Sequence, residues 1–321
     1  MRLSLFGILA SAALIRAGCF EKVCSDYSFD LSSTDNTNWM SQIGDNVDLS
    51  DLSIPGTRHS TTSLLWDDRF QCQNTNLKQQ LYSGIRYIDV TARQNNDKIE
   101  IYYRGFDTTY SLDSVLSIVF DFLEKYPHET VLVRIRKDTL YSGDDDAFET
   151  IMDRYLNSDT ELGRRAQALI YKRVLPSPFW RAPTLGLVRG RLVLLQDFPT
   201  KDIGRFGLPW GTTAVVESDW NWATGSVGMF LKWTFVKHGM KSALKEKERR
   251  LHFINTGISI GVDPYKAAGG RKPNRKGIND LLGDHFSEPN VARAGIIAMD
   301  FPGSKLVHNI IESNKNLRVA H

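Results

Sequence analysis

The sequence has few cysteines, little net charge and no long apolar run in its interior. Three cysteines, Cys19, Cys24 and Cys72, occur among 321 residues, and no Cys/His cluster has zinc-site spacing. A net charge of +3 gives no global signature of nucleic-acid binding, so we expect no nucleic-acid partner. No internal segment supplies the roughly 20 apolar residues of a transmembrane helix. No glycine-rich nucleotide loop follows the first expected strand, which argues against an open dinucleotide-binding sheet.

The first residues resemble a secretory signal. Arg2 precedes an apolar run from Leu3 to Ile15, and the small residues Ala17 and Gly18 follow, a pattern typical of a signal peptide. We therefore expect residues 1–18 to be a signal peptide, residues 19–321 to form a single domain, and the protein to be secreted. An oxidising destination favours one disulfide.

Among the three cysteines, Cys24 with Cys72 is the first choice for this disulfide. Such a bond would tie the N-terminal arm to the body of the domain. The sequence does not exclude Cys19 as the partner.

Short β-branched runs alternate with helical patterns along the chain. Eight mostly parallel strands in a chain with 41% hydrophobic residues favour an irregular α/β barrel of the TIM (β/α)8 type. The strands are expected at 49–54, 85–90, 99–104, 131–136, 192–196, 214–217, 251–255 and 295–300. Helices are expected near 77–83, 112–126, 147–157, 227–250 and 305–313.

Reactive groups of such barrels lie at the carboxyl ends of the strands and in the loops that follow. This rule selects a set of charged and aromatic residues: Arg58, His59, Asp89, Arg104, Arg136, Lys137, Asp219, Trp220 and Asp300. If they converge on one mouth, they form an anion site edged by carboxylates, because the planar guanidinium group matches phosphate geometry.

Five ordered segments resemble the X domain of phosphatidylinositol-specific phospholipase C, especially its small secreted bacterial and fungal forms. They are WMSQIGDNVDLSDLSIPGT (39–57), QLYSGIRYIDVTAR (80–93), FLEKYPHETVLVRIRK (122–137), TLGLVRGRLVLLQDF (184–198) and VARAGIIAMDF with IIESNKNL (291–317). The resemblance implies a barrel that cleaves the phosphodiester of an inositol phospholipid. It implies two histidines, one as the base that activates the inositol 2-hydroxyl and one as the acid that protonates the leaving group.

The sequence departs from the family at both histidine positions. Arg58 stands where the family places the base, and Arg104 stands where it places the acid. Guanidinium has a pKa above about 12, so it cannot act as a base and is a poor proton donor. We therefore expect cleavage to be weak or absent while phosphoinositide or another phosphodiester is still bound.

The resemblance also assigns supporting roles. Asp300 matches the carboxylate that orients the first histidine, and here we expect it to pair with Arg58; Asp89 matches an acidic position after the second strand. Thr91 replaces a residue that is arginine in bacterial members and an acidic ligand in calcium-dependent members, so we expect no metal and no cofactor.

Headgroup recognition in the family involves positions that are only partly kept. Arg136 and Lys137 fall where the family contacts the ring hydroxyls, and Asp219 with Trp220 falls near the pair on which the ring stacks. Gln196 and Asp197 replace a basic pair, so a different headgroup remains an alternative.

Two other functions stay open. His59 could restore the base if its loop slips by one residue, which would require breaking the pairing of Arg58 with Asp300, and the protein would then be an active phosphodiesterase. Alternatively, the barrel is only the scaffold of a secreted interaction protein.

Peripheral contact with an anionic lipid surface is suggested by two features. The segment 232–250 is rich in lysine and arginine, although a solvated helix face is the simpler interpretation. Trp210 and Trp222 are the tryptophans that we expect at an exposed rim.

Overall fold

The computed structural model describes residues 18–139, 144–172, 181–212, 215–218, 225–258, 260–270 and 275–319. Its centre is a parallel sheet with the strand order β10-β11-β12-β3-β4-β7-β8-β9. These strands are β3 (Ser53–Thr57), β4 (Tyr87–Asn95), β7 (Thr130–Lys137), β8 (Arg191–Asp197), β9 (Leu208–Pro209), β10 (Val215–Ser218), β11 (Leu251–Asn255) and β12 (Gly295–Met299). They form a nearly closed eight-stranded barrel, as the sequence predicts, with β9 and β10 at the ends of the hydrogen-bonded path.

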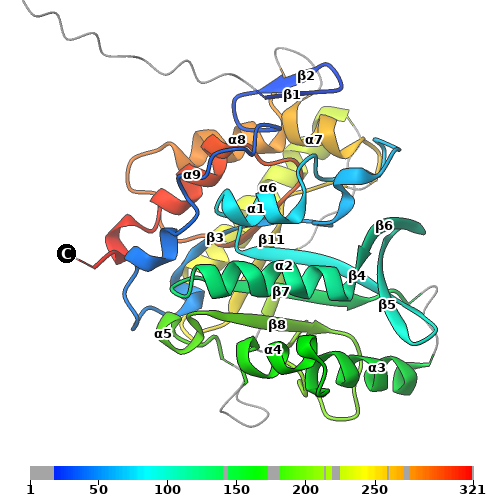
Figure 1. Ribbon diagram of the computed structural model, residues 1–321. Coiled ribbons are helices and arrows are strands. Elements are labelled where there is room, and N and C mark those ends of the chain that lie inside the picture. The colour runs from blue at the N-terminus through cyan, green and yellow to red at the C-terminus, as the bar shows by residue number, and fades with distance from the viewer. Residues whose placement is uncertain are drawn as a thin grey trace, which may run out of the picture.

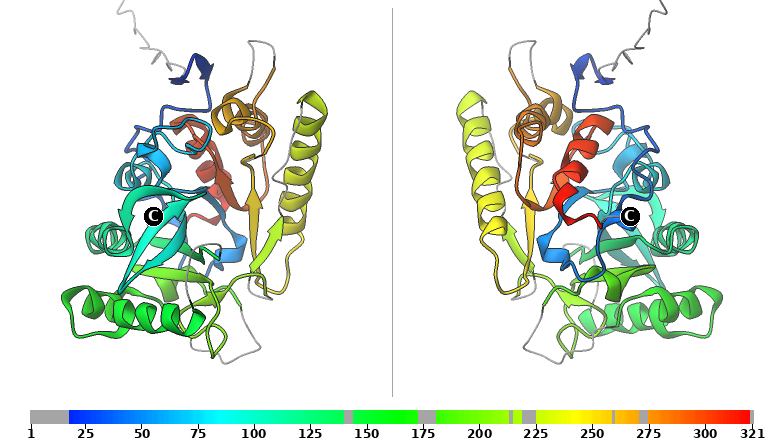
Figure 2. Two further views of the ribbon diagram at one scale, coloured as in Figure 1. Left: turned by 90° about the vertical axis from the view of Figure 1, so that its right-hand side faces the viewer. Right: turned by 90° about the vertical axis from the view of Figure 1, so that its left-hand side faces the viewer.

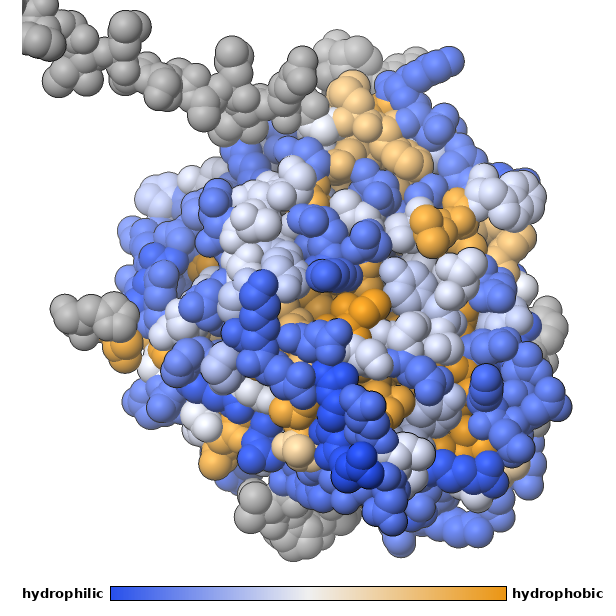
Figure 3. Space-filling model, in the orientation of Figure 1, coloured by the Kyte–Doolittle hydropathy of each residue, from blue (hydrophilic) through white to orange (hydrophobic). Residues whose placement is uncertain are grey.

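Helices cover the outside of the barrel (Figures 1 and 2). They are α1 (Leu77–Tyr82), α2 (Leu112–Lys125), α3 (Asp145–Asn157), α4 (Glu161–Leu169), α5 (Leu185–Val188), α6 (Gly225–Leu244), α7 (Pro264–Gly269), α8 (Ile278–Phe286) and α9 (Ser304–Glu312). Every residue of β3, β11 and β12 is buried, as expected for parallel strands with side chains in the barrel on one face and helices on the other. Hydrophilic residues cover most of the face in Figure 3.

One predicted barrel strand is wrong. The segment 99–104 lies in β5 (Lys98–Tyr103), which pairs antiparallel with the end of β4 and with β6 (Phe106–Ser111). The eighth barrel strand is instead the two-residue β9, which is too short to give a periodic signal. The β5–β6 hairpin turns at Arg104 and Gly105, with φ angles of 50° and 88°, and projects beside the barrel mouth (Figure 1).

The N-terminal hairpin corrects the disulfide prediction. Strands β1 (Gly18–Phe20) and β2 (Val23–Ser25) place Cys19 opposite Cys24, and these two cysteines form the disulfide. Cys72 is a buried free thiol. The hairpin partners are five residues apart, so local pairing brings them together before any contact with the loop that carries Cys72.

A buried ion pair lies near the amino-terminal ends of the central strands. Arg86 and Glu129 are both fully buried, and Arg86 Nε donates to Glu129 Oε2 at 2.8 Å. Arg86 also donates to the carbonyl oxygens of Thr37, Leu81 and Ile85. These bonds hold the start of β4 in place. They thereby fix the register of β4, the strand on which Asp89 lies.

Candidate functional site

A cavity of about 500 Å³ opens at the carboxyl ends of the strands. In Figure 1 the arrows of β4, β7 and β8 point to the right, so this end faces the viewer in the left panel of Figure 2. The wall residues come from the strand ends and following loops: Arg58, His59, Asp89, Thr91, Tyr103, Arg104, Gly105, Arg134, Arg136, Lys137, Asp138, Thr139, Glu217, Phe253, Asn255 and Ile260.

Most of the residues that the sequence selects meet in this cavity. Six of them line it, namely Arg58, His59, Asp89, Arg104, Arg136 and Lys137. Asp300 lies behind the wall, and Asp219 and Trp220 are outside the described residues. The roles assigned to these side chains remain predictions.

Arg58 forms a buried ion pair with Asp300. Its Nη1 lies 2.9 Å from Asp300 Oδ2, and the side chains are 3% and 1% exposed. Burial, the largest single effect, would lower the pKa of Arg58, but Asp300 together with Cys72, Tyr103 and Asp89 outweighs it, and the pKa lies above the ordinary arginine value. Arg58 is therefore a permanent cation, and its pairing with Asp300 agrees with the sequence prediction.

Asp300 is the partner of this pair whose pKa is raised by burial. Burial raises its pKa from 3.8 to about 6, although Arg58 and the fully buried Lys232 act in the opposite direction. Its Oδ2 accepts from Arg58, whereas its buried Oδ1 has no hydrogen-bond partner among the described residues. Asp300 is therefore a carboxylate that can take up a proton near pH 6.

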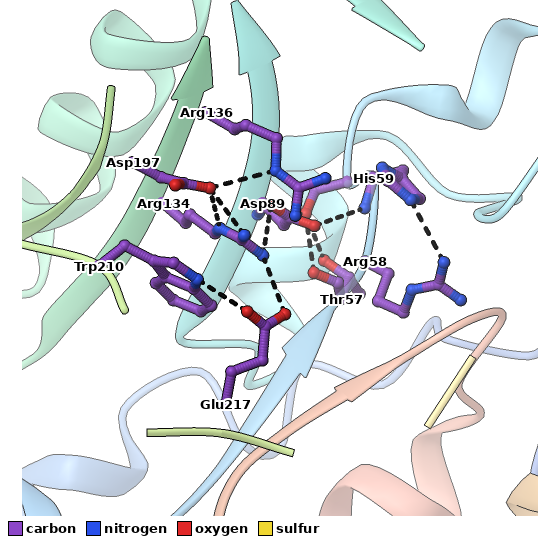
Figure 4. Close-up of polar contacts among 10 residues, drawn as sticks. Thr57, Arg58, His59, Asp89, Arg134, Arg136, Asp197, Trp210 and Glu217 are labelled. Atoms are coloured by element: carbon purple, nitrogen blue, oxygen red, sulfur yellow. Dashed lines mark hydrogen bonds and ion pairs between the residues drawn. The ribbon is translucent and has the colours of Figure 1, made fainter. Parts of the chain in front are cut away.

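His59 lies beside Arg58 and its ring stacks on Tyr103, with 3.8 Å between the ring centres. Its Nε2 faces Arg58 Nη2 at 3.3 Å, and its backbone N–H points to Asp89 Oδ2 at 3.5 Å (Figure 4). Burial, followed by the charge of Arg58, holds the pKa of His59 well below 6.5. The ring is therefore neutral, and because an arginine has only donors, its N–H donates the hydrogen bond and Nε2 of His59 accepts it.

This contact bears on the alternative role of His59. The loop does not slip, because Arg58 keeps Asp300 while His59 takes the next position. The nitrogen that would abstract a proton already uses its lone pair on Arg58. The left-handed backbone of His59, with φ of 41°, is a sparsely populated conformation of the kind that gathers at functional sites.

Arg104 lines the same cavity from the β5–β6 hairpin. It is exposed at the tip of the β5–β6 hairpin, with its guanidinium 5.8 Å from the ring centres of Phe70 and Tyr103. Positive φ at both turn residues is the geometry of a tight two-residue hairpin. The hairpin therefore presents a guanidinium at the place for which the resemblance implies an acid.

The sequence reasoning missed Arg134, which forms the floor of the cavity. Its Nη2 lies 2.7 Å from Asp197 Oδ2, and its Nη1 lies 4.0 Å from oxygens of Asp89 and Glu217. Its guanidinium also stacks on Trp210 (Figure 4). A signal was present, because Arg134 and Arg136 are two residues apart on β7 and therefore share one face of the strand.

Trp210 corrects the prediction of an exposed rim residue. It is only partly exposed, and its Nε1 donates to Glu217 Oε2 at 3.0 Å. Trp222 lies outside the described residues. Among the described residues, Trp66 is an exposed aromatic beside the mouth, because it is 81% exposed and meets Phe106 of the hairpin edge to face.

The basic segment 232–250 divides between two environments. Lys232 is fully buried near Asp300, whereas Lys237 and Lys241 of α6 and Lys245, which follows the helix, are exposed. The interpretation of a solvated face therefore holds for these three lysines but not for Lys232.

The described residues contain no helix long and apolar enough to cross a membrane. Within the same part of the chain, no group of three or more histidine, cysteine, aspartate or glutamate residues could hold a metal ion.

Comparison with known proteins connects this geometry with one family. Residues 57–178 match the model of "Phosphatidylinositol-specific phospholipase C, X domain". The chain is 29% identical over 301 residues to the 1-phosphatidylinositol phosphodiesterase of Listeria monocytogenes, with 88% of this chain and 87% of the relative covered. It is 23% identical to the Staphylococcus aureus (strain Newman) enzyme of the same name, with 91% and 98% covered.

A solved structure has the same fold. The phosphatidylinositol-specific phospholipase C from Listeria monocytogenes superimposes with a TM-score of 0.71 at 26% identity, with 87% of this chain and 98% of that chain covered.

Proposed function

Because the chain belongs to the phosphatidylinositol-specific phospholipase C X-domain family, we propose that it is a secreted protein that binds an inositol phosphodiester headgroup and does not cleave it efficiently. The observation that carries this proposal is that two guanidinium groups, those of Arg58 and Arg104, line the same cavity. The resemblance implies a histidine that transfers a proton at each of these two positions.

Phosphate binding is supported by the charge of the cavity wall. Arg104 is exposed and the Arg136 side chain is 41% exposed, so both can reach a ligand that enters the mouth. Thr91 lies beside Arg136 in the register of β4 with β7. Two guanidinium groups and a hydroxyl can bind the non-bridging oxygens of a phosphodiester.

Loss of cleavage is supported by the chemistry of the two arginines. Removing one general acid or base typically lowers the rate by about 100- to 10,000-fold. The remaining imidazole of His59 is already an acceptor for Arg58. The arginines can still stabilise the negative charge of the phosphate. We therefore expect the protein to bind the headgroup although it does not cleave it efficiently.

The test compares the native protein with the variant Arg58→His, Arg104→His. The release of inositol phosphate from vesicles that contain phosphatidylinositol is measured for both proteins and for a heat-treated sample. We expect release only from the double variant. Native release well above the heat-treated sample would contradict the proposal.

Peripheral membrane contact belongs to the same proposal. Trp66 and Leu64, which are 81% and 67% exposed, follow β3 and lie near the hairpin tip that carries Arg104. Apolar side chains beside a cationic mouth suit a surface of anionic lipids.

An active phosphodiesterase with His59 as its base is the second candidate. It is favoured by the presence of a neutral imidazole in the cavity wall. It requires the loss of activity in His59→Ala, whereas equal activity of the native protein and this variant would exclude it.

A further inference from the structure

The guanidinium of Arg58 lies between two groups that titrate. Its Nη1 binds Asp300 Oδ2 at 2.9 Å and its Nη2 faces His59 Nε2 at 3.3 Å. Figure 4 shows the Arg58 and His59 side chains meeting at the edge of the cluster. The positive charge that a phosphate encounters at this wall therefore depends on the protonation of its neighbours.

We propose that acid strengthens anion binding at this mouth, because protonation of Asp300 removes the counter-charge of Arg58. The inference rests on the proposed function, since it concerns the regulation of the same site. A ligand phosphate and the Asp300 carboxylate compete for one cation. When Asp300 is neutral, Arg58 has lost the carboxylate that binds it most closely and attracts the ligand phosphate more strongly, while Asp89 acts on Arg58 in both states.

The position of Asp300 makes this protonation possible without rearrangement. Its Oδ1 is buried and has no hydrogen-bond partner among the described residues, so a proton can bind there while Oδ2 still accepts from Arg58. Gly257 leaves no spare volume, since a Cβ at this residue would lie 1.7 Å from Arg58 Nη1. Arg58 is therefore kept in place when the charge of Asp300 changes.

The surrounding charges agree with this assignment. Asp300 faces Arg58, the buried Lys232 of α6 and the Cys72 thiol, and burial nevertheless raises its pKa to about 6. His59 faces Arg58, Arg104, Arg134 and Arg136, and burial with these cations lowers its pKa well below 6.5. His59 therefore gains its proton only in more acidic solution, and Asp300 is the first group to respond.

The experiment measures the affinity for glycerophosphoinositol at pH 5 and pH 7.5. This soluble phosphodiester keeps a single negative charge at both pH values. By calorimetry at low, constant ionic strength, we expect binding to be about tenfold tighter at pH 5, because one opposing charge near the phosphate is lost. Native affinity that is equal at the two pH values would overturn the inference but leave the proposed function intact. Failure to bind at both values would contradict the proposed function itself.

Variants identify the responsible group. Asp300→Asn should bind tightly at both pH values, whereas His59→Gln and the control Asp280→Asn should keep the pH dependence of the native protein. Asp280 is a suitable control because it is a carboxylate of raised pKa that bonds Ser25 and the backbone of Gly277, away from the cavity. A pH dependence that persists in Asp300→Asn, or disappears in His59→Gln, would refute the assignment.

Proton uptake tests the inference on the native protein if Asp300→Asn does not fold. Binding and protonation are linked reciprocally, so a phosphate that engages Arg58 must raise the pKa of Asp300. Calorimetry near pH 6 in buffers of different ionisation enthalpy should show net proton uptake on binding. Binding without uptake would overturn the inference.

Discussion

The Arg58 guanidinium occupies the space that a side chain at residue 257 would need. A Cβ on Gly257 would lie 1.7 Å from Arg58 Nη1 and 2.3 Å from Asp300 Oδ2, far inside van der Waals contact. The backbone does not require a glycine here, because φ at residue 257 is not positive. The glycine is required instead by the space that Arg58 and its ion pair with Asp300 occupy.

Gly257→Ala should consequently break the ion pair. We expect a loss of about 3–5 kcal/mol of unfolding free energy, because a displaced buried pair leaves uncompensated charges. Chemical denaturation measures this loss. In the background Arg58→Ala, Asp300→Ala the same change should cost much less, and an equal cost in both backgrounds would show that another contact requires the glycine.

The buried pair of Arg86 and Glu129 gives a stability prediction far from the cavity. Arg86→Met should lower the unfolding free energy by about 3–5 kcal/mol, because it leaves the buried Glu129 carboxylate without its cation. The matched control is Arg154→Met, which removes an exposed pair with Asp97 whose side chains are 58% and 84% exposed. We expect a change within about 1 kcal/mol there. Urea denaturation of the two variants compares the costs, and similar losses would contradict the assignment.

The raised pKa of Asp300 also predicts a pH dependence of stability. Its pKa is 3.8 in an ordinary environment and about 6 in the folded protein, so the folded state holds the proton more strongly between these values. Stability contributed by this group is therefore present below pH 4 and is lost as the pH rises through 6. The difference in unfolding free energy between the native protein and Asp300→Asn should fall by roughly 2–3 kcal/mol from pH 4 to pH 7. A difference independent of pH would contradict this.

A single reversion should not restore cleavage. Arg58→His supplies an imidazole next to Asp300, but Arg104 still lines the cavity at the tip of its hairpin. We expect the Arg58→His variant to remain near the level of the heat-treated sample and the double variant to exceed it by at least about 100-fold, the typical contribution of one general acid. Equal rates for the single and double variants would mean that Arg104 does not prevent cleavage.

The barrel and most of its mouth could be predicted because their signals are local. Buried parallel strands read as apolar runs, and the strand-end rule located Arg58, Asp89 and Arg136. The remaining features depend on which distant residues meet. Arg134 lies inside a strand, and only the assembled barrel shows that Asp89, Asp197 and Glu217 surround it.

Two errors have the same origin. The segment that became β5 has the composition of a barrel strand, and its antiparallel pairing is decided by the tight turn at Arg104 and Gly105. A bond between Cys24 and Cys72 would tie the N-terminal arm to the domain, whereas the short β1–β2 hairpin brings Cys19 and Cys24 together.

Trp66 provides the prediction for membrane contact. Its 81% exposed ring lies beside the hairpin that carries Arg104, so a lipid surface facing the mouth would cover it. Trp66→Ala should weaken binding to anionic vesicles roughly tenfold, since burying a large apolar side chain contributes on the order of 1.5–3 kcal/mol. Its affinity for soluble glycerophosphoinositol should not change. Leu187→Ala is the control, because Leu187 is 56% exposed on α5, which precedes β8 at the other end of the barrel. Vesicle sedimentation distinguishes the variants, and equal losses in both would mean that the mouth does not face the membrane.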